Sequence, residues 1–273
     1  LPDLAKDATD RNRTSPFAFT GNKFEFRMVG SSDSVASPNI VLNTIVAQAF
    51  REASEVLESA ENFEIAVHDL IKKNCAEHQR IIFNGNGYSE AWVEEAERRG
   101  LSNIRSMVDA IPALVSDKSV ELFEKFKVFT RAELESRVEV KYEGYSKAIN
   151  VEARAMVDIA GKQIIPAVIK YVKSLADTIN SVNGVGGIDV SVEMELLTET
   201  SQLLKETQNA WKVLRERVEA ASAMKQGEQQ ARYYYEQVTT AMEDLRSPVD
   251  QLEMIVDKSV WPMPSYGDLM FEV

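Results

Sequence analysis

Apolar residues along the second half of the chain recur at steps of three, four and seven, which places them on one face of an α-helix. This pattern predicts three long helices. The first extends from about Tyr145 to Asn180, and Pro166 is expected to bend it. The second is marked by apolar residues spaced seven apart: Leu197, Leu204, Trp211 and Val218.

The third helical stripe runs from near Tyr234 to Val256, and Ser247-Pro248 is expected to cap one helix and start another. Each apolar stripe needs a partner that covers it, so we expect a helical bundle or hairpin. The alternative is that part of the same stripes forms contacts between copies of the chain, because large exposed apolar faces are rare without a partner.

The first half of the chain predicts shorter helices. One is expected over residues 39–60, after Pro38, and another over 92–99, where Gly100 suits the C-terminal cap. The Asn-Gly-Asn-Gly segment 84–87 is a turn-rich break between them. The predicted fold class is therefore mainly α.

A short β segment is expected over residues 23–27, where charged and aromatic residues alternate. In a strand, Lys23, Glu25 and Arg27 would share one face and the two phenylalanines the other. This face has two interpretations. It is either an exposed strand with weak ion pairs, or a site where Glu25 binds a divalent metal ion while Lys23 and Arg27 bind substrate oxygens.

Composition limits the functions open to the chain. Its 273 residues include 31 Lys and Arg against 43 Asp and Glu, a formal net charge of −12. Such an acidic protein is not expected to bind nucleic acid generally. The sequence contains no apolar run of about 18 residues, so a membrane partner is not expected either. Residues 1–30 nevertheless carry a net +1, which favours a site for a small anion there; a solvated loop of mixed charge is the alternative.

The chain starts with Leu1 rather than Met, has no basic and apolar leader, and contains one cysteine. We therefore expect an excerpt of a longer, cytoplasmic protein. The Gly-rich residues 183–187 lack a Walker lysine, so an interhelical connection is expected. His68 and Cys75 would lie about 10.5 Å apart along a helix axis, too far for one zinc ion.

Three segments carry a further signal: residues 10–17 (DRNRTSPF), 21–27 (GNKFEFR) and 37–39 (SPN). They resemble the C-terminal part of a glutamine synthetase catalytic domain, with its Asn-Arg-Ser/Thr element, Glu-x-Arg strand and Asn-Pro-Tyr-type helix start. The closing residues 261–273 (WPMPSYGDLMFEV) resemble the type III branch of that family. The resemblance implies an α+β catalytic-domain fragment over residues 1–130 and a helical type III C-terminal domain, a long-helix bundle, over 131–273.

The resemblance also implies site residues. Glu25 matches the glutamate that ligates a metal next to the ATP phosphates, and Arg27 matches the arginine that binds glutamate and faces the transferred phosphoryl group. Arg13 matches an arginine in phosphate and substrate contact, and Lys23 lies near a basic position before the strand. The chain departs from the family at Ala18, where a second arginine is expected.

The implied activity is an ATP-dependent ligase that forms glutamine from glutamate and ammonia through a γ-glutamyl phosphate, with ATP and Mg²⁺ or Mn²⁺ as cofactors. Metals and arginines would stabilise the charge that both steps build on oxygen atoms. Because Mg²⁺ takes about six oxygen ligands and the chain offers one convincing carboxylate, the other ligands are expected upstream and the excerpt alone is expected to be inactive. The family also implies ring-shaped homo-oligomers with active sites between adjacent subunits.

Two other functions stay open. The helical stripes are also consistent with a noncatalytic oligomerisation or interaction module from a degenerate family member. A weaker possibility is a ligase that joins another amine to glutamate, because relatives with that activity share the Glu-x-Arg strand.

Overall fold

The structure, a computed structural model, describes residues 17–19, 24–26, 34–83, 87 and 89–271. The chain forms two compact units. One comprises residues 1–105 and 113–134, and the other comprises residues 106–112 and 135–273. Most described residues are helical, which confirms the mainly α fold class.

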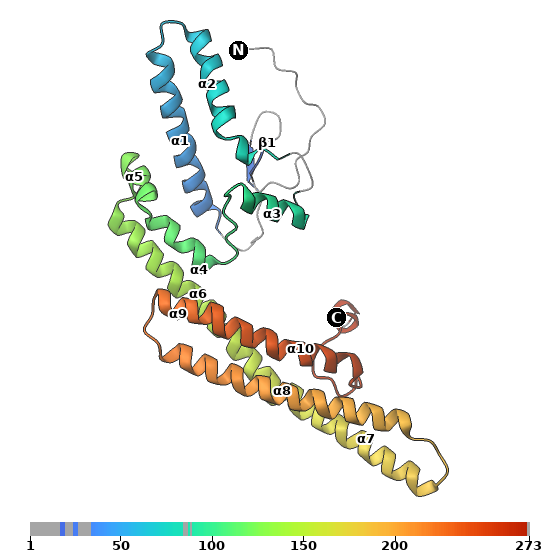
Figure 1. The fold of residues 1–273 in the computed structure, drawn as a ribbon. Helices are drawn as coiled ribbons and strands as arrows, with labels where there is room; N and C mark the ends of the chain where they lie inside the picture. The colour runs from blue at the N-terminus through green and yellow to red at the C-terminus, as the bar shows by residue number, and fades with distance from the viewer. Residues whose placement is uncertain (1–16, 20–23, 27–33, 84–86, 88, 272–273) are drawn as a thin grey trace. The chain divides into compact units, whose positions relative to one another are not determined.

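The first unit begins with two short antiparallel strands and continues with helices. Its elements are β1 (Phe17–Phe19), β2 (Phe24–Phe26), α1 (Ala36–Glu58), α2 (Phe63–Glu77), a 3₁₀ turn (Gln79–Ile81), α3 (Glu90–Arg98) and α5 (Asp117–Lys125). Figure 1 shows α1 and α2 side by side, joined by a short turn. The side chain of Asn62 caps α2 by accepting a hydrogen bond from the Ile65 amide at 3.1 Å.

The helix ends of this unit follow local sequence signals. Helix α1 begins three residues before the predicted start, so Pro38 lies in its first turn, where a missing N–H costs no intrahelical hydrogen bond. Helix α3 ends as predicted: Gly100 adopts φ +68°, and the Leu101 amide donates to the Ala96 carbonyl at 2.9 Å. This is a Schellman motif, which requires a residue that tolerates a left-handed backbone.

A small apolar cluster holds α5 and the beginning of α6 (Arg131–Ile159) together. Val120, Phe123 and Leu134 are buried, and Ile40 of α1 packs against them. Thr130 caps α6 in a reciprocal capping box: the Thr130 amide donates to the Glu133 carboxylate at 2.8 Å, and the Thr130 hydroxyl accepts from the Glu133 amide at 3.3 Å.

The second unit is built from long helices. After α4 (Met107–Ala110) and most of α6, its elements are a π-helical turn (Ala160–Ile164), α7 (Ile165–Val185), α8 (Ser191–Ala223), α9 (Glu228–Tyr233), a second π-helical turn (Tyr234–Val238), α10 (Thr239–Ile255) and α11 (Tyr266–Phe271). Figure 1 shows α7 and α8 as a hairpin, with α10 lying along α8. The interhelical connection predicted at residues 183–187 is confirmed only in part: residues 183–185 are the end of α7, and residues 186–190 join α7 to α8.

Two buried clusters run along this bundle. The larger one joins α6, α8 and the helices that follow α8; it contains Ala153, Ala160, Leu214, Val218, Ala221, Tyr234, Val238, Ala241 and Leu245. The second joins α7, α8 and the end of α10 through Ile164, Val168, Leu203, Leu252 and Val256. The predicted bundle is therefore present, and its apolar stripes cover one another.

Two details of the helix prediction were wrong. The first helical run starts at Arg131 and ends at Val185, so it is longer than the stripe over 145–180. Helix α10 passes through Ser247-Pro248 without ending, and Pro248 is buried inside it. Burial of the surrounding apolar face offsets the hydrogen bond that proline cannot donate, so tertiary packing overrides the local signal.

Candidate functional site

The strand pair β1–β2 carries the one sequence-predicted site residue whose backbone the structure describes. Glu25 lies in the middle of β2 and pairs with Ala18 of β1; the flanking pairs are Phe17 with Phe26 and Phe19 with Phe24. Ala18, the position where the family resemblance led us to expect an arginine, thus stands directly opposite the predicted metal ligand. A cation at position 18 would be a cross-strand neighbour of position 25, about 5 Å away between Cβ atoms.

The other predicted site residues, Arg13, Lys23 and Arg27, lie outside the described residues, so their roles stay predictions. In the described ranges, no group of three or more His, Cys, Asp or Glu side chains is arranged to hold a metal ion. Cys75 is exposed on α2, and His78 forms the C-cap of that helix. The metal-ligand role of Glu25 likewise stays a prediction, because the structure describes only the backbone at that position.

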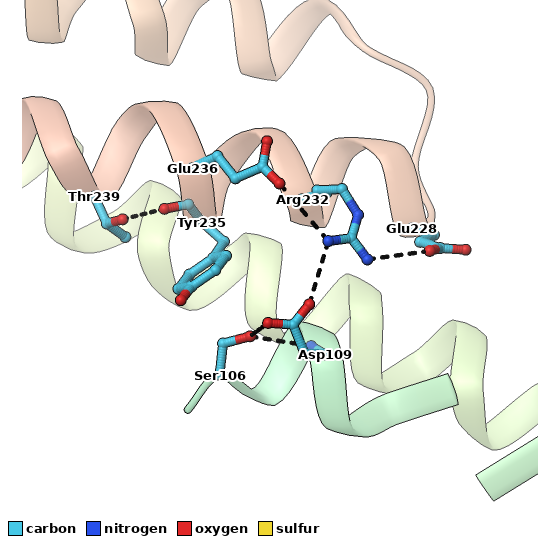
Figure 2. A network of polar contacts seen from close by, with 7 residues as sticks. All are labelled: Ser106, Asp109, Glu228, Arg232, Tyr235, Glu236 and Thr239. Carbon is cyan, nitrogen blue, oxygen red and sulfur yellow. Dashed lines mark hydrogen bonds and ion pairs between the residues drawn. The ribbon is translucent and has the colours of Figure 1, made fainter. Parts of the chain in front are cut away.

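A polar network that the sequence did not predict joins α4 to α9, and Figure 2 shows it. The Arg232 guanidinium lies 3.2 Å from Asp109, 3.4 Å from Glu228 and 3.7 Å from Glu236. A hydrogen bond from Ser106 and then one from Arg232 lower the pKa of Asp109, and the hydrogen bonds that Arg232 donates to Asp109 and Glu228 raise the pKa of Arg232. Three carboxylates already surround this arginine. It therefore connects α9 to α4 through ion pairs and does not form a site for an anionic ligand.

Ser106 shows how the local sequence places this network. Its hydroxyl accepts from the Asp109 amide at 3.0 Å and donates to the Asp109 carboxylate at 2.7 Å, which caps α4. The cap turns the second carboxylate oxygen of Asp109 toward Arg232, 123 residues later. The Ser-x-x-Asp spacing is visible in the sequence, but its distant partner is not.

A second polar cluster fixes α3 to the segment before it. Glu95 accepts hydrogen bonds from Arg98 at 2.7 Å and from Arg99 at 2.5 Å, which lower its pKa to about 2. Arg99 also donates to the Ile82 carbonyl at 2.8 Å, and Phe83 stacks on Trp92 with ring centroids 3.9 Å apart. These contacts hold the chain on both sides of the turn-rich break.

Comparisons with known proteins give the family. The glutamine synthetase C-terminal domain matches residues 66–183. A type-3 glutamine synthetase of Dictyostelium discoideum is 36% identical over 99% of this chain, and glutamine synthetases of Butyrivibrio fibrisolvens and Bacteroides fragilis are each 34% identical over 99% of it. The chain belongs to the glutamine synthetase family. The predicted type III resemblance is confirmed.

This member of the glutamine synthetase family spans 38% to 39% of the length of these relatives. The match over residues 66–183 runs across position 130, and the division into a catalytic-domain part before it and a type III part after it stays a prediction. Within the described residues, every helix is too short or too polar to cross a membrane.

Proposed function

We propose that this chain is part of an ATP-dependent ligase that forms glutamine from glutamate and ammonia. The observation that carries the proposal is the identity of 34% to 36% to glutamine synthetases across 99% of the chain, which leaves almost none of it unmatched. The matched region therefore includes the strand pair with Glu25. Because the chain spans little more than a third of these relatives, it contributes one part of the active site, and alone it is inactive.

The proposed reaction proceeds in two steps. A γ-carboxylate oxygen of glutamate attacks the γ-phosphorus of ATP, ADP leaves, and a γ-glutamyl phosphate forms. Ammonia then attacks the γ-carbonyl carbon and inorganic phosphate leaves with that carboxylate oxygen. Negative charge develops on phosphoryl oxygens in the first step and on the carbonyl oxygen in the second, and preorganised cations lower the barrier to both.

Each candidate residue has a role in that scheme. Glu25 would hold Mg²⁺ or Mn²⁺, which supplies positive charge to the ATP phosphates. Arg27 would bind glutamate and face the transferred phosphoryl group, Arg13 would contact substrate and phosphate, and Lys23 would add positive charge at the nucleotide. A divalent ion needs about six oxygen ligands, so the remaining ligands belong to the part of the relatives' length that this chain does not span.

The proposal extends to the assembly. The family resemblance implies a cytoplasmic homo-oligomer, a ring in which adjacent subunits share each active site. The exposed apolar side chains of α11 favour contacts between subunits through the second unit. Four of them are more than half exposed: Tyr266, Leu269, Met270 and Phe271. An oligomerisation module is accordingly the second candidate function, compatible with the first.

The first function is tested on the whole protein that contains this chain. ADP release and glutamine formation are measured with ATP, glutamate, ammonia and Mg²⁺ or Mn²⁺. Arg27→Ala should lower turnover by about 100-fold or more, because it removes a cation from the developing charge. Arg51→Ala, which removes an arginine from the exposed face of α1, is the matched control and should leave turnover unchanged. Normal turnover in Arg27→Ala would refute the site assignment.

The second function has its own test. Replacing Leu269 and Phe271 together with serine should reduce the mass of the assembly measured by light scattering, since both side chains are exposed and their loss exposes no core. An assembly of unchanged mass would exclude α11 as an oligomer contact. Discrete assemblies without ATP hydrolysis in the whole protein would favour a degenerate, noncatalytic member.

A further inference from the structure

A polar cavity of about 220 Å³ opens in the second unit, between α6 and the segment from the end of α8 to the second π-helical turn. Helix α6 lines it with a stripe at helical spacing: Glu143, Ser146, Lys147, Asn150 and Arg154. The opposite wall includes Ser222, Gln230 and Tyr234. None of these residues takes part in the proposed ligase chemistry.

Buried polar side chains line the cavity. Ser146, Gln230 and Tyr234 are only 4%, 7% and 2% exposed. The Ser146 hydroxyl has no hydrogen-bond partner in the structure. By contrast, the buried hydroxyl of Thr207 donates to the carbonyl four residues before it, at 2.8 Å. A buried hydroxyl without a partner is unfavourable, so a ligand that reached Ser146 would form a hydrogen bond that the fold leaves unmade.

A fixed guanidinium stands at the same cavity. Arg154 donates from Nε to the Asn150 side chain at 3.0 Å and from Nη2 to the Ser222 hydroxyl at 3.1 Å. Both acceptors are neutral. The carboxylate four residues later, Asp158, pairs with Lys162 instead. Within the described part of the chain, no ion pair compensates the charge of Arg154.

The charges around the cavity set the charge of the ligand. Lys147 forms an ion pair with Glu143 at 2.5 Å, so those two charges cancel. Arg154 therefore leaves a net +1. One carboxylate balances that charge, and a guanidinium forms strong charge-assisted hydrogen bonds to a carboxylate.

We propose that this cavity binds a small monocarboxylate whose carboxylate contacts Arg154 and whose polar end reaches Ser146. The volume holds roughly seven water molecules at about 30 Å³ each, which fits a molecule of a few carbon atoms with a hydroxyl or amide. The proposal is independent of the ligase function, because it uses residues of the second unit alone.

The test is equilibrium binding by calorimetry on the whole protein at constant ionic strength. The probe is 4-hydroxybutyrate, with its neutral amide and inorganic phosphate as comparison ligands. Binding of 4-hydroxybutyrate should saturate. Arg154→Gln should weaken it at least about tenfold, the loss of one charge-assisted contact. Arg246→Gln is the matched control: it removes the same charge from an exposed ion pair on α10, outside the cavity, and should change nothing.

A second variant separates binding from folding. Ser146→Ala should weaken binding about fivefold, the loss of one neutral hydrogen bond, while leaving the unfolding temperature unchanged or higher, because it deletes an unpartnered hydroxyl. The proposal is overturned if binding does not saturate below about 10 mM. It is also overturned if phosphate or the neutral amide binds as well as the carboxylate, or if Arg154→Gln behaves like Arg246→Gln.

Discussion

The α1–α2 hairpin and the α6–α10 bundle present similar apolar stripes in the sequence but bury them very differently. Over its 23 residues α1 buries one side chain, Thr44, and α2 buries none, whereas α8 alone buries six residues. Phe50 on α1 is 71% exposed, while Leu214 on α8 is fully buried. A helical period shows which face of a helix is apolar; whether another element covers that face depends on the tertiary structure.

The largest expected effect comes from truncating a buried side chain in the core of the bundle. Leu214→Ala should lower the free energy of unfolding by about 2–5 kcal/mol, because it removes buried methyl groups and leaves a cavity beside Val218 and Tyr234. Chemical denaturation followed by circular dichroism measures the change. Phe50→Ala is the contrasting variant in the hairpin and should cost less than about 0.5 kcal/mol. Equal losses in the two variants would show that α1 is covered as well as α8.

The second effect tests the close approach of helices at the first π-helical turn. A Cβ on Gly161 would lie 2.9 Å from Trp211 Nε1, whose N–H donates to the Val157 carbonyl at 2.8 Å. Gly161→Ala should therefore cost about 1–3 kcal/mol through overpacking. Gly144→Ala, on α6 with no atom within 4 Å of the added Cβ, should instead stabilise by up to about 1 kcal/mol. Thermal unfolding followed by tryptophan fluorescence would contradict this account if both variants were stabilised.

Much of the helical fold could be predicted because local signals and packing agree. The apolar residues spaced seven apart over 197–218 lie within α8, and Gly100 ends α3 as a left-handed cap. At Ser247-Pro248 the same kind of local reasoning failed, because burial of α10 against α8 outweighs one missing hydrogen bond. Local chemistry predicts helix ends where nothing packs against them, and it misleads where a buried helix continues through a weak position.

The third effect concerns Lys127, a non-glycine residue with φ +54° that ends α5. The Val128 amide donates to the Phe123 carbonyl across it, so the position is a left-handed helix cap that favours glycine. Lys127→Gly should stabilise the first unit by about 0.5–1 kcal/mol, measured as a rise in the denaturation midpoint. Lys125→Gly, at the last residue of α5, should instead destabilise by up to about the same amount, because that residue has right-handed helical backbone. Stabilisation by Lys125→Gly would contradict this interpretation.

The smallest effect is a pH dependence at α3. The pKa of Glu95 is about 2 because Arg98 and Arg99 donate hydrogen bonds to its carboxylate. The ordinary pKa is near 4.5, so this contribution is fully present above pH 4.5 and is lost as the pH falls toward 2. Glu95→Gln should reduce amide-exchange protection in α3 at pH 6 and change it little at pH 2. Glu94→Gln, on the same helix without those hydrogen bonds, should show no such dependence.

The candidate sites were predictable only in part. The spacing of Glu25 and Arg27 predicts a strand site, and the register that places Ala18 opposite Glu25 came from the structure. The cavity beside Ser146 could not be found in the sequence, because Asn150 and Ser222 lie 72 residues apart and meet only when α8 returns along α6. The α6 stripe of Ser146, Asn150 and Arg154 was a visible signal, but polar stripes usually face solvent.

Isotope transfer tests the central claim most directly, that this chain serves a ligase acting through a γ-glutamyl phosphate. The whole protein is supplied with ATP, ammonia and glutamate labelled with ¹⁸O in its γ-carboxylate, and the released phosphate is analysed by mass spectrometry. The proposed reaction transfers one labelled oxygen to each phosphate as glutamine forms, and Arg27→Ala slows that transfer by about 100-fold or more. Unlabelled phosphate, or ADP release without glutamine, would contradict the account.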